Sequence, residues 1–355
     1  MSFITTMIES LNQIAEERRL EPWTSWKDGR PKGYFDNSQD KGIAPFFKEN
    51  GFVVIEGALN SQEISDLRAE ATKIARGELG DIRGIPFDAS NLTDEEVLRE
   101  ILCIHFPHKI SALTKEILGH QAFVNVLTRV IGPNVKCMQS MLFIKGSGKP
   151  GQAWHQDEIY IPTRDRSLTG GWIALDDATV ENGCLWVIPG SQRSGTLYFQ
   201  EWHADPRFDC SEEAKRFPYT NDEAVPVEVK AGSIVFFNGY LLHRSLPNYS
   251  EGGFRRALVN HYMSAESLLP WGDSGKVGTP VAQFDSRDIE RLDSKQPVRD
   301  YFRFILPGSI EKHHRHLPCV SLVAVAGQPL VSSQASASFS CRSTLYCGTR
   351  GSCSE

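Results

Sequence analysis

The chain carries a histidine and an aspartate separated by one residue, a pair that can bind a metal ion. The segment Trp154-His155-Gln156-Asp157 predicts a β-strand, on which residues i and i+2 project from the same face. His155 and Asp157 are therefore expected to face one cavity. A second histidine from another strand would complete a facial set of two imidazoles and one carboxylate, which holds Fe(II) and leaves coordination positions open.

His243 is the candidate for this second imidazole. It follows the apolar segment SIVFF, and Arg255 begins the next predicted strand, so the two residues are expected to line one wall. Open positions on a ferrous ion suit a chelating 2-oxo acid and O₂. Arginine suits the remote carboxylate of 2-oxoglutarate because its planar guanidinium makes two parallel charged hydrogen bonds. Arg256 is the competing residue, since only one of two adjacent strand residues faces inward.

Six segments between residues 40 and 263 extend this pattern. They are FFKENGFVVIEG, IGPNVKCMQSMLFIK, WHQDEIY, GGWIALDDATVENGCLWVIPGS, AGSIVFFNGYLLHRS and GFRRAL. In this order they resemble the phytanoyl-CoA dioxygenase family of Fe(II)- and 2-oxoglutarate-dependent oxygenases. The chain departs from the family pattern at Gln192, where relatives often have a histidine, and beyond about residue 307, where no resemblance is found.

The resemblance implies a role for individual residues. The implied iron ligands are His155, Asp157 and His243. Arg255 is implied to hold the distal carboxylate of 2-oxoglutarate, assisted by the hydroxyl of Ser245, two residues beyond His243. Positions that line the co-substrate in relatives are matched by Lys109, Met141 and Trp172, and Gln139 lies on the same strand face as Met141. The ordinary alternative for a strand methionine or tryptophan is a place in the core.

The elements expected to position these residues change in character along the chain. Residues 40–57 predict a short helix followed by a strand, and Asn60 with Glu63 predicts the start of a further helix. A second helical zone is expected over residues 94–130. Residues 134–263 are a series of short strands separated by Gly, Pro and Asn-Gly turns. The fold class is therefore α+β with a mainly β core, a double-stranded β-helix (the cupin-like jelly roll) with flanking N-terminal helices.

We expect one oxygenase domain over residues 40–306, preceded by a helical extension over residues 1–39. Within the domain, residues 195–223 form a polar insertion that carries aromatic side chains, among them Tyr198, Phe199, Trp202 and Phe208, which favours a lid. Residues 307–355 are rich in serine and small residues, and we expect them to be disordered. A histidine cluster in this tail is expected to be solvated; it consists of His313, His314 and His316.

The composition is that of an ordinary globular protein. The 355 residues are 40% hydrophobic and 23% charged, and the formal net charge is -6. The 38 basic residues form no stripe along the chain, so nothing favours nucleic acid or an anionic membrane as a partner. A small-molecule substrate is therefore expected.

The sequence predicts neither a secretory signal nor a membrane span. No run of about 18 apolar residues occurs, which argues against a membrane span. Residues 1–20 lack the pattern of a secretory signal, so an intracellular, cytoplasmic protein is expected. The eight cysteines are too sparse for a disulfide framework and are expected to be free thiols. No pattern indicates an oligomeric state.

The leading hypothesis is a dioxygenase that uses Fe(II), 2-oxoglutarate and O₂ to hydroxylate a C–H bond of a small molecule, with release of succinate and CO₂. Halogenating relatives lack the carboxylate ligand, so Asp157 favours hydroxylation. The alternatives are a non-catalytic jelly-roll protein that binds or senses a metal and a zinc hydrolase with the same ligands. His105, His108 and His261 can reach the cavity rim, but each is expected to be structural or exposed. The substrate determinants are expected in residues 195–223 and in the loop near Trp271.

Overall fold

A computed structural model describes residues 31–80, 82–83, 89–209, 212–267, 279–284, 289–291 and 323–326. The expectations for residues 1–30, for the loop near Trp271 and for the histidine cluster of the tail lie outside these residues. None of the helices in the described part of the chain is long and apolar enough to cross a membrane.

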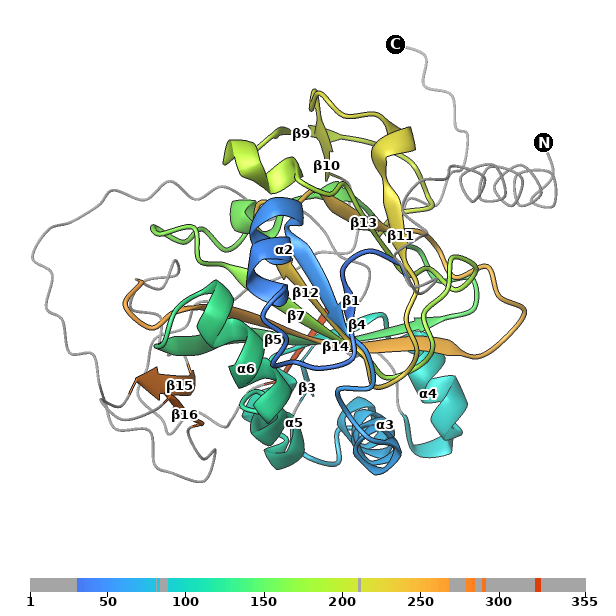
Figure 1. Ribbon diagram of the computed structural model, residues 1–355. Helices are drawn as coiled ribbons and strands as arrows, with labels where there is room; N and C mark the ends of the chain where they lie inside the picture. The colour runs from blue at the N-terminus through green and yellow to red at the C-terminus, as the bar shows by residue number, and fades with distance from the viewer. Residues whose placement is uncertain are drawn as a thin grey trace, which may run out of the picture.

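Two sheets of unequal size form the centre of the molecule (Figure 1). The large sheet has eleven strands, with the order β1-β2-β12-β7-β14-β5-β4-β17-β3, and β15 and β16 branch from β5. Its strands are β1 (Tyr34–Phe35), β2 (Phe52–Ile55), β3 (Ile82–Arg83), β4 (Cys103–His105), β5 (Val135–Gly146), β7 (Thr169–Ala174), β12 (Ile234–Asn238), β14 (Phe254–Ser264), β15 (Thr279–Phe284), β16 (Ile289–Arg291) and β17 (Val323–Ala326).

The small sheet has four strands in the order β11-β8-β13-β6, and a separate hairpin joins β9 to β10. The small-sheet strands are β6 (Gln152–His155), β8 (Leu185–Val187), β11 (Val225–Val227) and β13 (His243–Ser245), and the hairpin strands are β9 (Phe199–Trp202) and β10 (Glu212–Lys215). This hairpin lies within the insertion over residues 195–223 and stands at the top of Figure 1.

Strand alternation divides the core into two clusters. On β12, Phe236 belongs to the cluster shared with the helices, whereas Val235 and Phe237 belong to the cluster shared with the small sheet. Successive strand residues point to opposite faces, so one sheet serves both clusters. The helices gather on the outer face of the large sheet (Figure 1). They are α2 (Ile43–Asn50), α3 (Ser61–Ala75), α4 (Asp94–Glu100), α5 (Ala112–Ile117) and α6 (Gln121–Val130).

The start of α3 follows the predicted signal. The Asn60 side chain accepts hydrogen bonds from the N–H groups of Gln62 and Glu63, and the Glu63 carboxylate accepts one from the Asn60 N–H. This reciprocal pair satisfies amide groups that have no partner inside the helix. The helix buries one stripe of side chains, Ile64, Leu67, Ala71 and Ile74, against the large sheet.

The helical zone expected over residues 94–130 was only partly right. Between α4 and α5 the chain forms β4, whose residues pair antiparallel with β5, His105 opposite Met141. A three-residue strand has no periodicity of its own, so only its partner strand identifies it. In the tail expected to be disordered, β17 lies parallel to β4; the rest of residues 307–355 is outside the described residues.

Two adjacent glycines on β7 allow aromatic rings to contact both faces of the large sheet. A Cβ atom on Gly171 would lie 2.3 Å from Cε1 of Phe123, and one on Gly170 would lie 2.3 Å from Cζ of Phe237. Phe123 comes from α6 and Phe237 from β12. The Gly170-Gly171 pair therefore sets how closely the helix layer and the inner core approach β7, immediately before Trp172.

We predict that Gly171→Ala lowers the free energy of unfolding by about 1–3 kcal/mol, because the added methyl group overpacks a closed core. Thermal unfolding monitored by circular dichroism measures the change. Gly252→Ala is the matched control, since a Cβ there meets nothing within 4 Å. Equal melting temperatures for the two variants would contradict the close approach at β7.

Candidate metal centre

The structure brings His155, Asp157 and His243 together. One possible ligand atom from each side chain lies within 4.8 Å of the others. His155 is the last residue of β6 and His243 is the first residue of β13, and the two are directly paired across these antiparallel strands. Backbone pairing in the small sheet thus places the two imidazoles side by side, with ring centroids 4.1 Å apart.

Asp157 reaches the same point from a different element than expected. The predicted strand through Asp157 is wrong at its end, because β6 stops at His155 and Asp157 opens a 3-10 turn, η3 (Asp157–Ile159). The intervening Gln156 is still extended, with φ -133° and ψ 123°, so the alternation that turns residues i and i+2 to one face is kept. The Gln156 amide group donates to the carbonyl oxygens of Thr196 and Tyr240.

Both imidazoles are held by backbone carbonyl groups. His155 Nδ1 lies 2.8 Å from the Ala153 oxygen, and His243 Nδ1 lies 2.9 Å from the Leu241 oxygen. A carbonyl oxygen only accepts, so Nδ1 carries the proton in each neutral ring and Nε2 presents its lone pair. The Nε2 atoms lie 3.6 Å and 3.5 Å from Asp157 Oδ1. These three atoms are the ones that a metal ion would bind.

The ionisation of the site favours metal binding. Burial, together with the neighbouring His243, lowers the pKa of His155 to about 4, which keeps this imidazole neutral at physiological pH. Burial alone would raise the pKa of Asp157, but His243 and the hydrogen bond from His261 outweigh it and hold this pKa below its usual range. The centre therefore offers neutral imidazole at His155 and a carboxylate at Asp157 without a change in protonation.

His261 was not among the residues predicted for the metal centre. It lies on β14, is 4% exposed, and its Nε2 lies 3.0 Å from Asp157 Oδ2. An Nε2–H donated to this oxygen leaves Oδ1 for the metal and fixes the rotation of the carboxylate. The sequence does contain a signal for this position: His261 is an even number of residues from Arg255 on one predicted strand, so both side chains are expected to face inward.

Arg255 lies on the same inward face of β14. Arg255 is 3% exposed, its Cζ atom lies 5.5 Å from the centroid of the Trp172 ring, and its Nε has no hydrogen-bond partner among the described residues. Burial lowers the pKa of Arg255 to about 10, so the guanidinium stays charged at neutral pH. The competing Arg256 donates from Nε and Nη2 to the two oxygens of Asp176, each at 2.8 Å.

The other residues expected to line the co-substrate differ in their burial and in their contacts. Trp172 is buried on β7, and Met141 is half-buried on β5 against the core between the sheets. Gln139 donates from its amide nitrogen to Nδ1 of His105 at 3.0 Å. Lys109 is exposed at the end of a 3-10 turn, η2 (Pro107–Lys109), where its ammonium group lies 4.5 Å from the Phe106 ring centroid.

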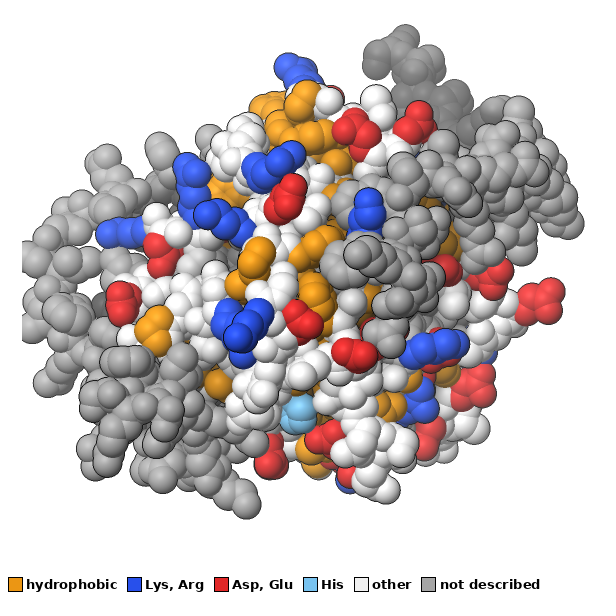
Figure 2. Space-filling model, viewed as in Figure 1, with side chains coloured by type: hydrophobic (Ala, Val, Ile, Leu, Met, Phe, Trp, Pro, Cys, Tyr) orange, Lys and Arg blue, Asp and Glu red, His pale blue; other side chains and the backbone are white. Residues whose placement is uncertain are grey.

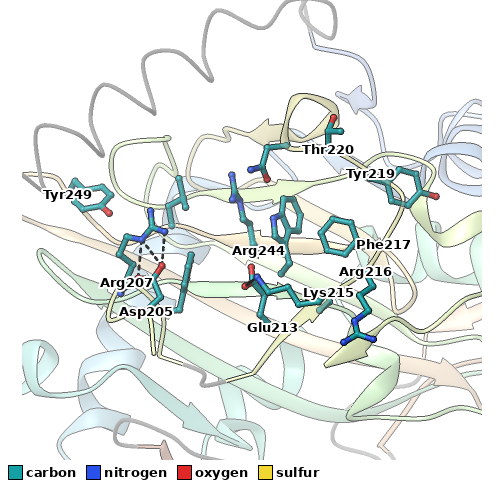
Figure 3. A pocket seen from close by; sticks show the side chains of 15 residues that line it. Asp205, Arg207, Glu213, Lys215, Arg216, Phe217, Tyr219, Thr220, Arg244 and Tyr249 are labelled. Carbon is teal, nitrogen blue, oxygen red and sulfur yellow. Dashed lines mark hydrogen bonds and ion pairs between the residues drawn. The ribbon is translucent and has the colours of Figure 1, made fainter. Parts of the chain in front are cut away.

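A separate cavity of about 490 Å³ lies on the opposite face of the small sheet (Figure 3). Trp154 and Arg244, the chain neighbours of His155 and His243, line it, with Arg244 Cζ 4.7 Å from the Trp154 ring centroid. Adjacent strand residues point to opposite faces, so this sheet separates the cavity from the metal ligands. The rest of the lining comes from residues Asp205, Arg207, Phe208, Glu213, Ala214, Lys215, Arg216, Phe217, Tyr219, Thr220, Asn221, Leu246 and Tyr249.

The insertion over residues 195–223 therefore covers the outer face of the small sheet. Its first residues also reach Gln156, whose side-chain oxygen accepts a hydrogen bond from the Tyr198 N–H. Phe199 and Trp202 on its hairpin are 63% and 69% exposed, and Figure 2 shows hydrophobic side chains at the top of the molecule, where this hairpin lies. A lid over the metal ligands stays a prediction.

We predict that His261→Ala lowers the affinity for a divalent metal by about 10- to 100-fold, because the Asp157 carboxylate loses the donor that orients it. Anaerobic calorimetric titration with Mn(II) or Fe(II) measures this affinity. His203→Ala, in the insertion, is the control and should bind as the unmodified protein does. Unchanged affinity in His261→Ala would show that Asp157 needs no such support.

Comparisons with solved structures agree with the fold. The non-haem monooxygenase ThoJ has 21% sequence identity and a TM-score of 0.53, covering 66% of this chain and 82% of ThoJ. The epimerase SnoN of nogalamycin biosynthesis has 19% identity and a TM-score of 0.51, covering 68% of this chain and 94% of SnoN. The predicted α+β fold with a mainly β double-stranded β-helix is confirmed.

Sequence comparisons point to one family. A phytanoyl-CoA dioxygenase of Arabidopsis thaliana is 34% identical over 164 residues, which cover 46% of this chain and 56% of that protein. Phytanoyl-CoA dioxygenase 1 of Oryza sativa is 28% identical over 251 residues, covering 62% of this chain and 88% of that protein. The family model described as phytanoyl-CoA dioxygenase (PhyH) matches residues 47–257. Since this match spans more than half of the sequence, the chain belongs to the phytanoyl-CoA dioxygenase family, as its motifs predicted.

Proposed function

We propose that the protein is an Fe(II)- and 2-oxoglutarate-dependent dioxygenase that hydroxylates a C–H bond of a small molecule. In this reaction O₂ gives one oxygen atom to the substrate and one to succinate, and 2-oxoglutarate loses CO₂. The observation that carries the proposal is the position of a buried, positively charged Arg255 on the strand that also carries His261, the partner of Asp157. The support of a proposed metal ligand and the proposed site for the co-substrate carboxylate thus lie on one strand.

The residues present fit an iron ion. The Nε2 atoms of His155 and His243 and the Oδ1 atom of Asp157 would hold it, because their other polar atoms are already hydrogen-bonded to the protein. Two imidazoles and one carboxylate are the donor set of non-haem Fe(II) oxygenases and leave positions open for other ligands. When bound, Fe(II) supplies the activation of O₂, coupled to the oxidative decarboxylation of 2-oxoglutarate.

The residues also fit the co-substrate. Arg255 would bind its distal carboxylate, since no carboxylate of the described residues forms an ion pair with this arginine. A buried guanidinium is costly unless an anion accompanies it. Ser245 would donate its hydroxyl to the same carboxylate, and Trp172 covers the guanidinium with its ring. These residues orient the co-substrate and exclude water from one side of it.

No observation favours the alternative functions. A non-catalytic metal-binding protein or a zinc hydrolase would use the same three ligands, but neither gives a role to Arg255.

The cytoplasmic location stays a prediction, and one relative, from Homo sapiens, is named a peroxisomal phytanoyl-CoA dioxygenase. It is 30% identical over 240 residues, which cover 62% of this chain and 67% of that protein.

We predict that the iron-loaded protein forms succinate from 2-oxoglutarate in the presence of O₂, and that Asp157→Ala abolishes this formation because the metal loses its only carboxylate ligand. Chromatographic quantification of succinate measures the reaction, and metabolite extracts that stimulate it would reveal the substrate. Asp205→Asn, at the outer cavity, is the control and should retain the rate. A metal-loaded protein that neither binds nor consumes 2-oxoglutarate would contradict the proposed function.

The two adjacent arginines are predicted to behave differently. Arg255→Gln should raise the KM for 2-oxoglutarate by tens-fold, since a lost charged hydrogen-bond partner costs about 1.5–3 kcal/mol. Arg256→Gln should change this KM little, because its guanidinium is occupied by Asp176. Steady-state kinetics at saturating O₂ compares the variants. Equal increases would mean that the inward-facing arginine has been misidentified.

A further inference from the structure

A second buried cation, Lys145, accompanies Arg255. Lys145 lies on β5 and is the direct cross-strand partner of Arg255 on β14, and the two side chains are 2% and 3% exposed. Directly paired residues of antiparallel strands project from the same face. No carboxylate of the described residues forms an ion pair with either cation. Burial, followed by the nearby Arg255, lowers the pKa of Lys145 well below its usual value, and an anion bound beside the two side chains would favour the ammonium form again.

The ammonium group of Lys145 has no donor left for a ligand. Its Nζ donates to the Leu246 oxygen at 2.7 Å, to Ser245 Oγ at 2.9 Å and to the Gly183 oxygen at 3.4 Å. A lysine ammonium group has three N–H donors. All three are therefore committed to the protein, and Lys145 can act on a bound molecule only through its charge and through Ser245.

The hydrogen bonds of Ser245 leave its hydroxyl proton available to a ligand. Its Oγ accepts from Lys145 Nζ and from the Gln152 N–H at 3.2 Å. A hydroxyl group has two lone pairs and one proton. With both lone pairs occupied, the O–H must point elsewhere, and none of the described residues accepts it. An anion next to Arg255 would receive this proton as a charge-assisted hydrogen bond.

We propose that Lys145 is a positioning residue for the distal carboxylate of the co-substrate, an assignment that rests on the proposed function. It holds Ser245 Oγ as an acceptor so that the Ser245 O–H donates to the carboxylate. Its charge, added to that of Arg255, makes the deep end of the site select a 2-oxo acid with a second carboxylate over one that ends in an alkyl group.

The test compares two ligands that share the 2-oxo acid group. Calorimetry on the Mn(II)-loaded full chain measures the Kd of 2-oxoglutarate and of 2-oxobutyrate, which lacks the distal carboxylate. We expect Lys145→Met to weaken 2-oxoglutarate binding by about tenfold or more, with 2-oxobutyrate binding unchanged. Lys145→Gln, which keeps a donor for Ser245 Oγ, should lose less. Equal weakening of both ligands, or no change for either, would overturn the proposal.

Two further variants separate positioning from general disruption. Ser245→Ala combined with Lys145→Met should weaken 2-oxoglutarate binding less than the sum of the two single effects, because one residue acts partly through the other. Fully additive effects of the two substitutions would overturn the proposal that Lys145 acts through Ser245. Lys136→Met is the matched control: Lys136 is another buried lysine of β5, its Nζ donates to the Ala265 and Ser267 oxygens, and both Kd values should stay unchanged.

The outcomes also separate this proposal from the proposed function. If the unmodified Mn(II)-loaded protein binds neither 2-oxo acid, the proposed function fails. If it binds 2-oxoglutarate and Lys145→Met binds it equally well, only the role of Lys145 fails. Thermal unfolding shows whether Lys145→Met folds. If it does not, Lys145→Gln is compared with the unmodified protein instead. An unchanged preference of Lys145→Gln for 2-oxoglutarate over 2-oxobutyrate would then overturn the proposal.

Discussion

The pairing of His155 with His243 across β6 and β13 is the interaction on which the site depends. It sets the imidazoles side by side, and backbone carbonyls at Ala153 and Leu241 turn both Nε2 atoms toward Asp157. A slip of one residue in this register would turn one imidazole to the outer face, where Trp154 and Arg244 now lie. The backbone of the small sheet, more than any side-chain contact, therefore creates the ligand set.

Charge is divided between the two ends of one strand. Toward its end, β14 carries His261, which binds the Asp157 carboxylate; near its start it carries Arg255, which lies beside Lys145. The end with His261 and Asp157 is suited to a cation, and the end with Arg255 and Lys145 is suited to an anion. A bound metal ion and a dicarboxylate would each neutralise the buried charge at their own end. The same strand thus fixes the separation between the metal and the distal carboxylate.

Local sequence patterns predicted those features that depend on neighbouring residues. Strand alternation predicted that His155 and Asp157 face one cavity, although Asp157 lies in a 3-10 turn, and the Asn60–Glu63 spacing predicted the start of α3. The roles of β4, His261 and Lys145 depend on partners far away in the sequence. Lys145 has no local signal at all, because its importance follows from its place opposite Arg255 across two strands.

Anomalous X-ray diffraction from crystals grown without O₂, with Fe(II) and 2-oxoglutarate, is the most direct measurement. We predict one iron peak within bonding distance of His155 Nε2, His243 Nε2 and a single oxygen of Asp157, with the distal carboxylate of 2-oxoglutarate at Arg255 and Ser245. Iron bound away from these three ligands, or a distal carboxylate that contacts neither Arg255 nor Ser245, would contradict it.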